Sequence, residues 1–231
     1  MFIQKITIMA YIVAGNDASP IPPDAITDVP GTMPKIGGRA GDANDGGALW
    51  WDHDDPGQPG APGFQGLQGI PGKDGERGGD TPLGALIIIH QAINGSFPVL
   101  ISGGHGQPGG QGGRGGTGGD GQDGGNADDE QPAGAGGTGG KGGKGGTGGK
   151  GGGGGNIYEV DILIGSTVDV SLVDITYTQG IQGAKGPGGP NGFPGNPGNG
   201  PGGMGGQPGD WGDWGPQDPN GIVSKAKIIV G

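Results

Sequence analysis

The sequence predicts a mainly irregular fold. It would be a bundle of extended polyglycine II rods with Gly-X-Y and Gly-Gly-X triplets, joined by β-hairpins that form a small β-sheet or sandwich, with no helix. Glycine and proline supply 67 and 21 of the 231 residues. Glycine recurs at every third position through four runs, and apolar segments separate the runs. A chain this rich in glycine and proline is disordered unless it is periodic, so the period decides the fold class.

The four glycine runs span residues 57–80, 103–126, 136–156 and 180–217. Each run keeps its three-residue frame, except that the last shifts by one residue at Gly200. The polyproline II conformation has three residues per turn and no internal hydrogen bonds. Each triplet position therefore forms its own stripe along a rod, and the backbone amides must bond to neighbouring rods. Flexible linkers keep no such frame.

The triplet types predict where each rod lies. A stripe of glycine lets another backbone approach closely, so a Gly-Gly-X rod accepts neighbours on two sides. Residues 103–126 and 136–156 are mostly Gly-Gly-X, and we expect them at the centre of the bundle. Ordering each residue's backbone costs about 1–2 kcal/mol, whereas a hydrogen bond returns a net ~0.5–1.5 kcal/mol. The apolar segments must therefore stabilise the bundle and set its register.

Two segments predict β-hairpins, residues 84–102 and residues 157–178. Each contains two apolar stretches around a turn signal, Asn94-Gly95 in the first and Gly165-Ser166 in the second. Asn-Gly between two such stretches is a strong hairpin signal. Both hairpins connect successive glycine runs, so we expect them to gather into the β part of the fold.

The chain ends add a strand within residues 1–14 and another within residues 218–231, and residues 15–56 form a loop region between the first strand and the first rod. A secretory signal is the alternative for the N-terminus, but alternation with period two favours a retained strand. Unpaired apolar edge strands attract other strands, so the two pair with each other or complete a neighbour's sheet. The candidate assembly residues are Ile6, Ile8, Ile12, Ile228 and Val230.

A turn at residues 127–135 is expected to send the third rod back antiparallel along the second. This places Asp120 and Asp123 beside Lys141 and Lys144, although a solvated charged face explains the same residues equally well. The alternative for the whole chain is a collagen triple helix made by three copies. The Gly-Gly-X runs lack imino acids, and proline is scarcer than in collagen, which disfavours this alternative.

Charge and composition exclude several function classes. The formal net charge of −11, from 12 basic and 23 acidic residues, argues against a nucleic-acid partner. Cysteine is absent, so neither disulfides nor thiolate metal sites hold the fold together. No apolar run is long enough for a membrane-spanning helix, so we expect no membrane insertion.

The sequence shows no catalytic constellation, so we expect no enzyme activity, no catalytic residues and no cofactor. The three histidines are scattered along the chain: His53, His90 and His105. None is placed as the base of a nucleophile. The acidic cluster around His53 is a weak calcium candidate through carboxylate oxygens, with a solvated loop as the favoured interpretation. Its carboxylates are Asp52, Asp54 and Asp55.

The four tryptophans are the candidate receptor contacts. Trp50 and Trp51 lie in the loop region, and Trp211 and Trp214 occupy equivalent positions of two successive triplets. Exposed large aromatic side chains are typical of recognition surfaces. The alternative is that these side chains cover the flank of the bundle.

Long Gly-Gly-X runs, short hairpins and aromatic-bearing loops together resemble the glycine-rich adhesins at the tips of phage tail fibres. The resemblance covers residues 57–217 in style and carries over no residue-level motif. It implies layers of polyglycine II rods that carry receptor-contacting loops. "GIPGKDGERG" is similar instead to collagen-like segments of fibre proteins, and the triplets are similar to those of springtail antifreeze proteins, which use cysteines that this chain lacks.

The sequence therefore favours a non-enzymatic structural or adhesive protein, extracellular or on a virion surface. It would be a fibre tip or fibre component whose partner is a cell-surface receptor or other copies of itself. The first alternative is a self-assembling filament subunit joined through its terminal strands. The second is an ice-binding protein, which needs a flat, weakly polar face such as one bearing Thr117, Thr138 and Thr147.

Overall fold

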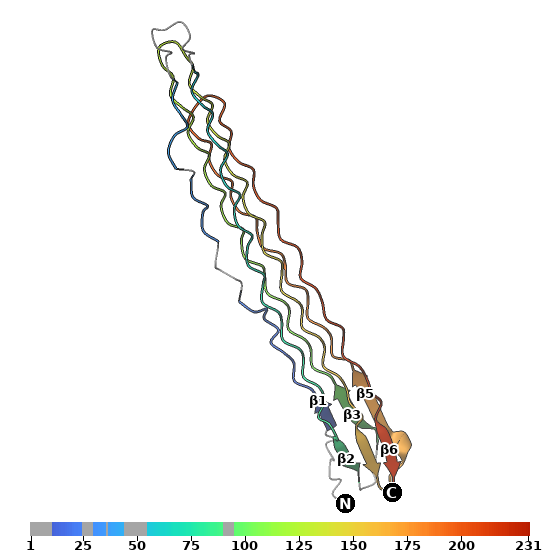
Figure 1. Ribbon diagram of the computed structural model, residues 1–231. Helices are drawn as coiled ribbons and strands as arrows, with labels where there is room; N and C mark the ends of the chain where they lie inside the picture. The colour runs from blue at the N-terminus through green and yellow to red at the C-terminus, as the bar shows by residue number, and fades with distance from the viewer. Residues whose placement is uncertain (1–10, 25–29, 36, 44–54, 90–94) are drawn as a thin grey trace, which may run out of the picture.

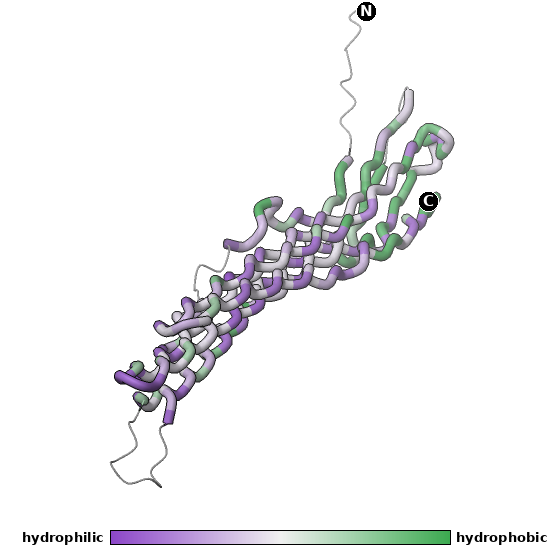
Figure 2. The backbone as a smooth tube through the Cα atoms, turned by 90° about the horizontal axis from the view of Figure 1, so that it is seen from above, coloured by the Kyte–Doolittle hydropathy of each residue, from purple (hydrophilic) through white to green (hydrophobic). Residues whose placement is uncertain are grey.

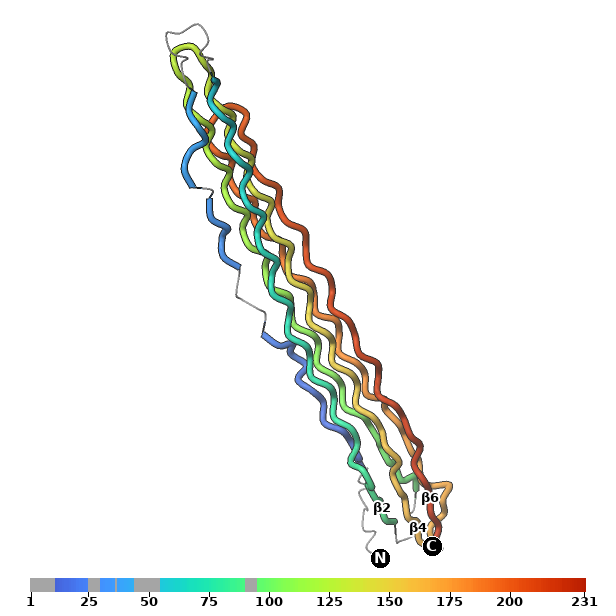
Figure 3. Tube along the Cα trace, in the orientation of Figure 1, coloured from blue at the N-terminus to red at the C-terminus, as the bar shows by residue number. Residues whose placement is uncertain are grey.

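The computed structural model describes residues 11–24, 30–35, 37–43, 55–89 and 95–231. The chain runs along an elongated bundle repeatedly, and its backbone can be followed from end to end in Figure 1 and Figure 3. We call each traverse a pass. The passes are pass 1 (11–43, with the gaps given above), pass 2 (55–89), pass 3 (95–126), pass 4 (134–164), pass 5 (173–199) and pass 6 (203–230).

Each pass combines an extended, irregular part with one short strand, and all strands lie at the same end of the bundle (Figure 1). The described residues contain no α-helix, as the sequence predicts, and one short 3-10 turn, η1 (Val170–Leu172). The strands are β1 (Tyr11–Ala14), β2 (Leu86–Ile89), β3 (Phe97–Ser102), β4 (Asp161–Ile164), β5 (Val173–Thr178) and β6 (Lys227–Val230).

The passes form two layers. Strands pair in parallel as β1-β3-β5 in one sheet and as β2-β4-β6 in the other. The glycine runs continue this division, since Gly63 N–H donates to Thr138 of pass 4 and Gly112 N–H to Pro187 of pass 5. Odd passes lead away from the sheets and even passes return toward them. Neighbours within a layer are therefore parallel, and neighbours in different layers are antiparallel.

The two predicted hairpins, residues 84–102 and residues 157–178, are wrong. β2 and β3 belong to different sheets, and so do β4 and β5. Each strand directly continues a glycine run, and successive runs lie in opposite layers. The connection therefore crosses between the sheets instead of turning within one. The described parts of the two terminal strands do not pair with each other either, because β1 and β6 also lie in different sheets.

The Gly-Gly-X runs occupy the centre, as their triplets predict. Pass 3 hydrogen-bonds to passes 1, 2, 4 and 5, and pass 4 to passes 2, 3, 5 and 6. Gly143 shows how close the backbones lie: its N–H donates to Gly116 O at 2.8 Å, and its carbonyl accepts from Gly192 N–H at 2.8 Å. A Cβ on Gly143 would lie 1.8 Å from Leu67 O. Only glycine fits such a position.

The turn at residues 127–135 makes passes 3 and 4 antiparallel, as predicted; the charge pairing predicted from it is wrong. Lys141 pairs with Asp210 at 2.9 Å and Lys144 with Asp213 at 2.7 Å, both in pass 6. The glycine stripes of the two central passes face each other, so their side chains point to opposite faces of the bundle. All runs belong to one chain, unlike the three-chain collagen alternative.

The hydrophobic core lies at the sheet end (Figure 2). Both sheets contribute to one buried cluster, and Ile101 of β3 and Ile162 of β4 are fully buried. The remaining buried members are Ile87, Ile89, Phe97, Val99, Ile157, Val160, Ile164 and Val168. Such burial is the main hydrophobic stabilisation available to this chain, because most glycine-run side chains are absent or exposed. The core therefore anchors the register of the passes.

Candidate binding surfaces

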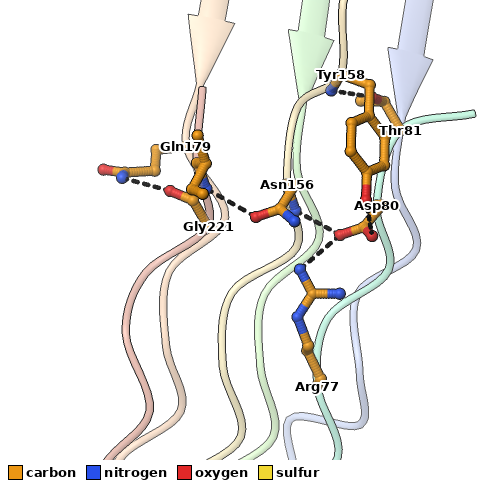
Figure 4. A network of polar contacts seen from close by, with 8 residues as sticks. Arg77, Asp80, Thr81, Asn156, Tyr158, Gln179 and Gly221 are labelled. Carbon is orange, nitrogen blue, oxygen red and sulfur yellow. Dashed lines mark hydrogen bonds and ion pairs between the residues drawn. The ribbon is translucent and has the colours of Figure 1, made fainter. Parts of the chain in front are cut away.

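A polar network joins the glycine runs to the sheets (Figure 4). Asp80 Oδ1 accepts hydrogen bonds from Asn156 N–H at 2.6 Å and from Arg77 Nη2 at 2.7 Å. Asp80 Oδ2 accepts from the Tyr158 hydroxyl at 3.0 Å. Tyr158 N–H donates to Thr81 Oγ1 at 2.8 Å. These groups satisfy one another's hydrogen bonds and link pass 2 to pass 4.

The same network reaches the next passes. Asn156 Oδ1 accepts from Ile222 N–H of pass 6 at 2.8 Å, and Gln179 Nε2 of pass 5 donates to Gly221 O at 2.7 Å. Hydrogen bonds from these side chains supplement the backbone bonds between passes at the level where the glycine runs become strands. Sequence reasoning missed this network, although Asp80 ends a regular Gly-X-Y run.

The network gives a pH prediction. The hydrogen bond from Arg77, helped by those from Asn156 and Tyr158, lowers the pKa of Asp80 below its ordinary value. A lowered folded-state pKa contributes stability above the unfolded value of about 3.9, and this contribution is lost as pH falls through the folded pKa. Asp80→Asn should therefore lower stability at pH 7 and flatten its decline below about pH 4. Urea unfolding midpoints from pH 7 to pH 2 measure both effects, and equal slopes for the two proteins would contradict the assignment.

Two of the predicted tryptophans lie on the outer edge of pass 6. Trp211 is 66 % exposed and Trp214 is 68 % exposed. Because the backbone hydrogen bonds of pass 6 recur every three residues, the Gly-Asp-Trp repeat puts both tryptophans on one stripe and both aspartates on another. Asp210 and Asp213 pair with the lysines of pass 4, which fixes how the stripe faces. We call Trp211 and Trp214 the tryptophan edge; Met204 is also 66 % exposed, but it occupies the triplet position of the aspartates and lies on their stripe.

A second apolar stripe lies on pass 2, at the other side of the same layer. Phe64, Leu67 and Ile70 are 51 %, 56 % and 43 % exposed. We call these three residues the pass 2 edge. Sequence reasoning missed it, although the signal was present: the second position of three successive Gly-X-Y triplets is a large apolar residue. Large apolar side chains repeated on one exposed stripe indicate a contact surface.

Several of the residues singled out in the sequence are not among those that the structure describes. Trp50, Trp51, Asp52, His53, Asp54, His90, Ile6 and Ile8 lie outside the described residues. Asp55 is exposed, and the described part of the chain holds no group of three histidine or carboxylate side chains placed to bind a metal. His105 Nδ1 accepts from Ile181 N–H at 3.1 Å beside a shallow hollow of about 340 Å³. That contact is structural.

The other assembly residues lie on outer strands. Ile12 is in β1, and Ile228 and Val230 are in β6; they are 64 %, 40 % and 59 % exposed. In the described residues, each of these strands has a neighbour on one side, which leaves an open edge in each sheet.

The threonines proposed for ice binding do not form one face. Thr117 lies on pass 3, whereas Thr138 and Thr147 lie on pass 4, and the side chains of these central passes point to opposite faces. Lys141 and Lys144 lie between the two threonines of pass 4. The structure therefore separates the residues of the expected flat face.

No protein-family model and no curated protein matches the chain. Among solved structures, one match is an antifreeze protein of the springtail Granisotoma rainieri, described as a nine polyproline type II helical bundle. It is 27 % identical, and the alignment covers 71 % of this chain and 96 % of that chain with a TM-score of 0.15. Likeness at this TM-score supports no inference about fold or function. No helix in the described residues is long and apolar enough to cross a membrane.

Proposed function

We propose that this chain is a non-enzymatic structural or adhesive protein, a component of a fibre outside the cell or on a virion surface. Its glycine runs are polyglycine II rods, and its two sheets pack as a small sandwich that anchors them. At about 3.1 Å per residue, the run from 57 to 80 extends roughly 74 Å. The fold is a stiff spacer whose side-chain stripes remain free to meet a partner.

One observation carries this proposal: backbone hydrogen bonds between passes recur every three residues along the runs. Gly137, Gly140, Gly143 and Gly146 of pass 4 each donate to pass 3, at 2.8 Å in every case. A linker has no such repeated register. The exposed tryptophan edge supports a contact role, since its two aromatic side chains are held outward beside ion-paired aspartates. A surface receptor and another copy of the chain are the two partners that the sequence predicts.

Immunogold electron microscopy of the cells or particles that make this chain tests the proposed function. Label on external fibres or on the particle surface is the expected result. Label confined to the cell interior would overturn the proposal. Small-angle scattering of the purified chain checks the rod itself, because a radius of gyration typical of random coil removes the structural basis.

The self-assembling filament is the second candidate function, and the open sheet edges at β1 and β6 favour it. Ice binding is not favoured, because its expected threonines lie on opposite faces and lysines interrupt one of the rows.

A further inference from the structure

Two apolar stripes flank the layer formed by passes 2, 4 and 6. The pass 2 edge lies on one side, and the tryptophan edge lies on the other. All five side chains are at least 43 % exposed. Exposed apolar stripes of this kind are costly in water unless a partner covers them.

The two stripes overlap in height along the bundle, where Ile70 is level with Trp211. Gly63 N–H donates to Thr138 O, and Gly139 N–H donates to Met204 O, so the triplet of Phe64 is level with Met204. The same pattern runs from Gly69 to Lys144 and from Gly145 to Asp210, so the triplet of Ile70 is level with Trp211. If two copies lay side by side and pointed the same way without a shift, Trp211 of one copy would face Ile70 of the next.

The strands of this layer are also placed to meet a second copy in the same orientation. β2 and β6 are its outer strands, both are parallel to β4, and each has an open side in the described residues. Leu86 and Ile88 of β2 are 55 % and 42 % exposed, and Ile228 and Val230 of β6 are 40 % and 59 % exposed. A second copy in the same orientation would bring its β2 beside β6, in the parallel sense already used inside the chain.

We infer that the partner of the tryptophan edge is the pass 2 edge of a second copy. This inference rests on the proposed fibre function and names the partner of the same surface. The contact continues the stacking by which passes 2, 4 and 6 already pack in parallel. It joins two different surfaces, so each copy keeps one edge of each kind free. Contacts of this type generate open assemblies, here a ribbon of parallel copies.

Side-chain packing forms the contact along the rods. Trp211 and Trp214 occupy the stripe where a neighbouring backbone would have to approach, so glycine-type hydrogen bonding is blocked there. The net charge of −11 on each copy opposes association, and salt screens this repulsion. Association should therefore strengthen with added NaCl.

Sedimentation equilibrium and negative-stain electron microscopy of the full chain test the inference. The wild-type chain should show masses above the monomer's 22.3 kDa that rise with concentration up to millimolar protein. The tryptophan-edge variant W211S/W214S and the pass 2 edge variant F64S/I70S should each associate at least tenfold more weakly. The matched control is Leu83→Ser, an exposed apolar residue outside both edges. Circular dichroism verifies that each variant is folded.

Mixing the two variants gives the sharper result. Each retains the edge that the other has lost, so the mixture should form dimers of one variant with the other and nothing longer. Ribbons or no dimers in the mixture would overturn the contact. A monomeric wild type that attaches to the producing cells or particles, with attachment lost in W211S/W214S, would assign the tryptophan edge to a receptor. That outcome overturns the second-copy contact and leaves the proposed function standing.

Discussion

Gly143→Ala is expected to destabilise the folded chain by about 3 kcal/mol or more, because the added methyl group has no room between the passes. The added Cβ would lie 1.8 Å from Leu67 O and 2.7 Å from Leu67 C, and both atoms belong to backbone that cannot rotate away. Relief requires pass 2 and pass 4 to separate, which breaks hydrogen bonds on both sides of the substitution. Thermal and urea unfolding measure the loss.

Gly205→Ala is the matched control, because it adds the same methyl group in pass 6, where a Cβ would meet nothing within 4 Å. Its stability should change by less than about 1 kcal/mol, with a small gain expected from the stiffer unfolded chain. Equal destabilisation by the two substitutions would mean that backbone proximity is not what demands glycine at position 143.

Ile162→Ala is expected to cost about 2–5 kcal/mol, the range for deleting a fully buried aliphatic side chain. Ile162 is 0 % exposed at the centre of the β2-β4-β6 sheet, and its side chain joins the core shared by both sheets. Since this core anchors the glycine runs, the extended signal of the runs should melt together with the strands. Circular dichroism at two wavelengths follows the two parts separately.

Ile222→Ala removes the same atoms from a residue that is 71 % exposed, and it should leave the melting temperature nearly unchanged. The informative comparison is the order of melting in Ile162→Ala. Glycine runs that keep their register after the strands have melted would show that the bundle stands without its β part.

The sequence predicts the features of the fold that depend on the three-residue period of glycine. The central position of the Gly-Gly-X runs and the outer position of the Gly-X-Y runs follow from which stripes are bare, because bare stripes decide which backbones can touch. The antiparallel direction of the two central passes follows from the turn at residues 127–135. The common stripe of Trp211 and Trp214 follows from the same period, since they share one triplet position.

The division of each predicted hairpin between two sheets could not be foreseen, because a local turn signal indicates a reversal of the chain and not the sheet that each strand joins. The sequence signal at Asn94-Gly95 predicts such a reversal, but the layer of each strand is fixed by the glycine run attached to it. The ion pairs of Lys141 and Lys144 failed for a related reason: sequence spacing placed their height and not the face on which they lie. The pass 2 edge could not be recognised as a contact surface from the sequence alone, because the exposure of its side chains depends on which passes lie beside it.

The hydrogen-bond register between passes also restricts how such a chain changes in length. An insertion of one or two residues inside a run rotates every later side chain onto another stripe, whereas the turn between passes 5 and 6 absorbs a frame shift at Gly200, whose φ of 133° suits glycine. Lengthening must therefore proceed by whole triplets added at one height to all passes. The length of the bundle can therefore change only in steps of one triplet per pass.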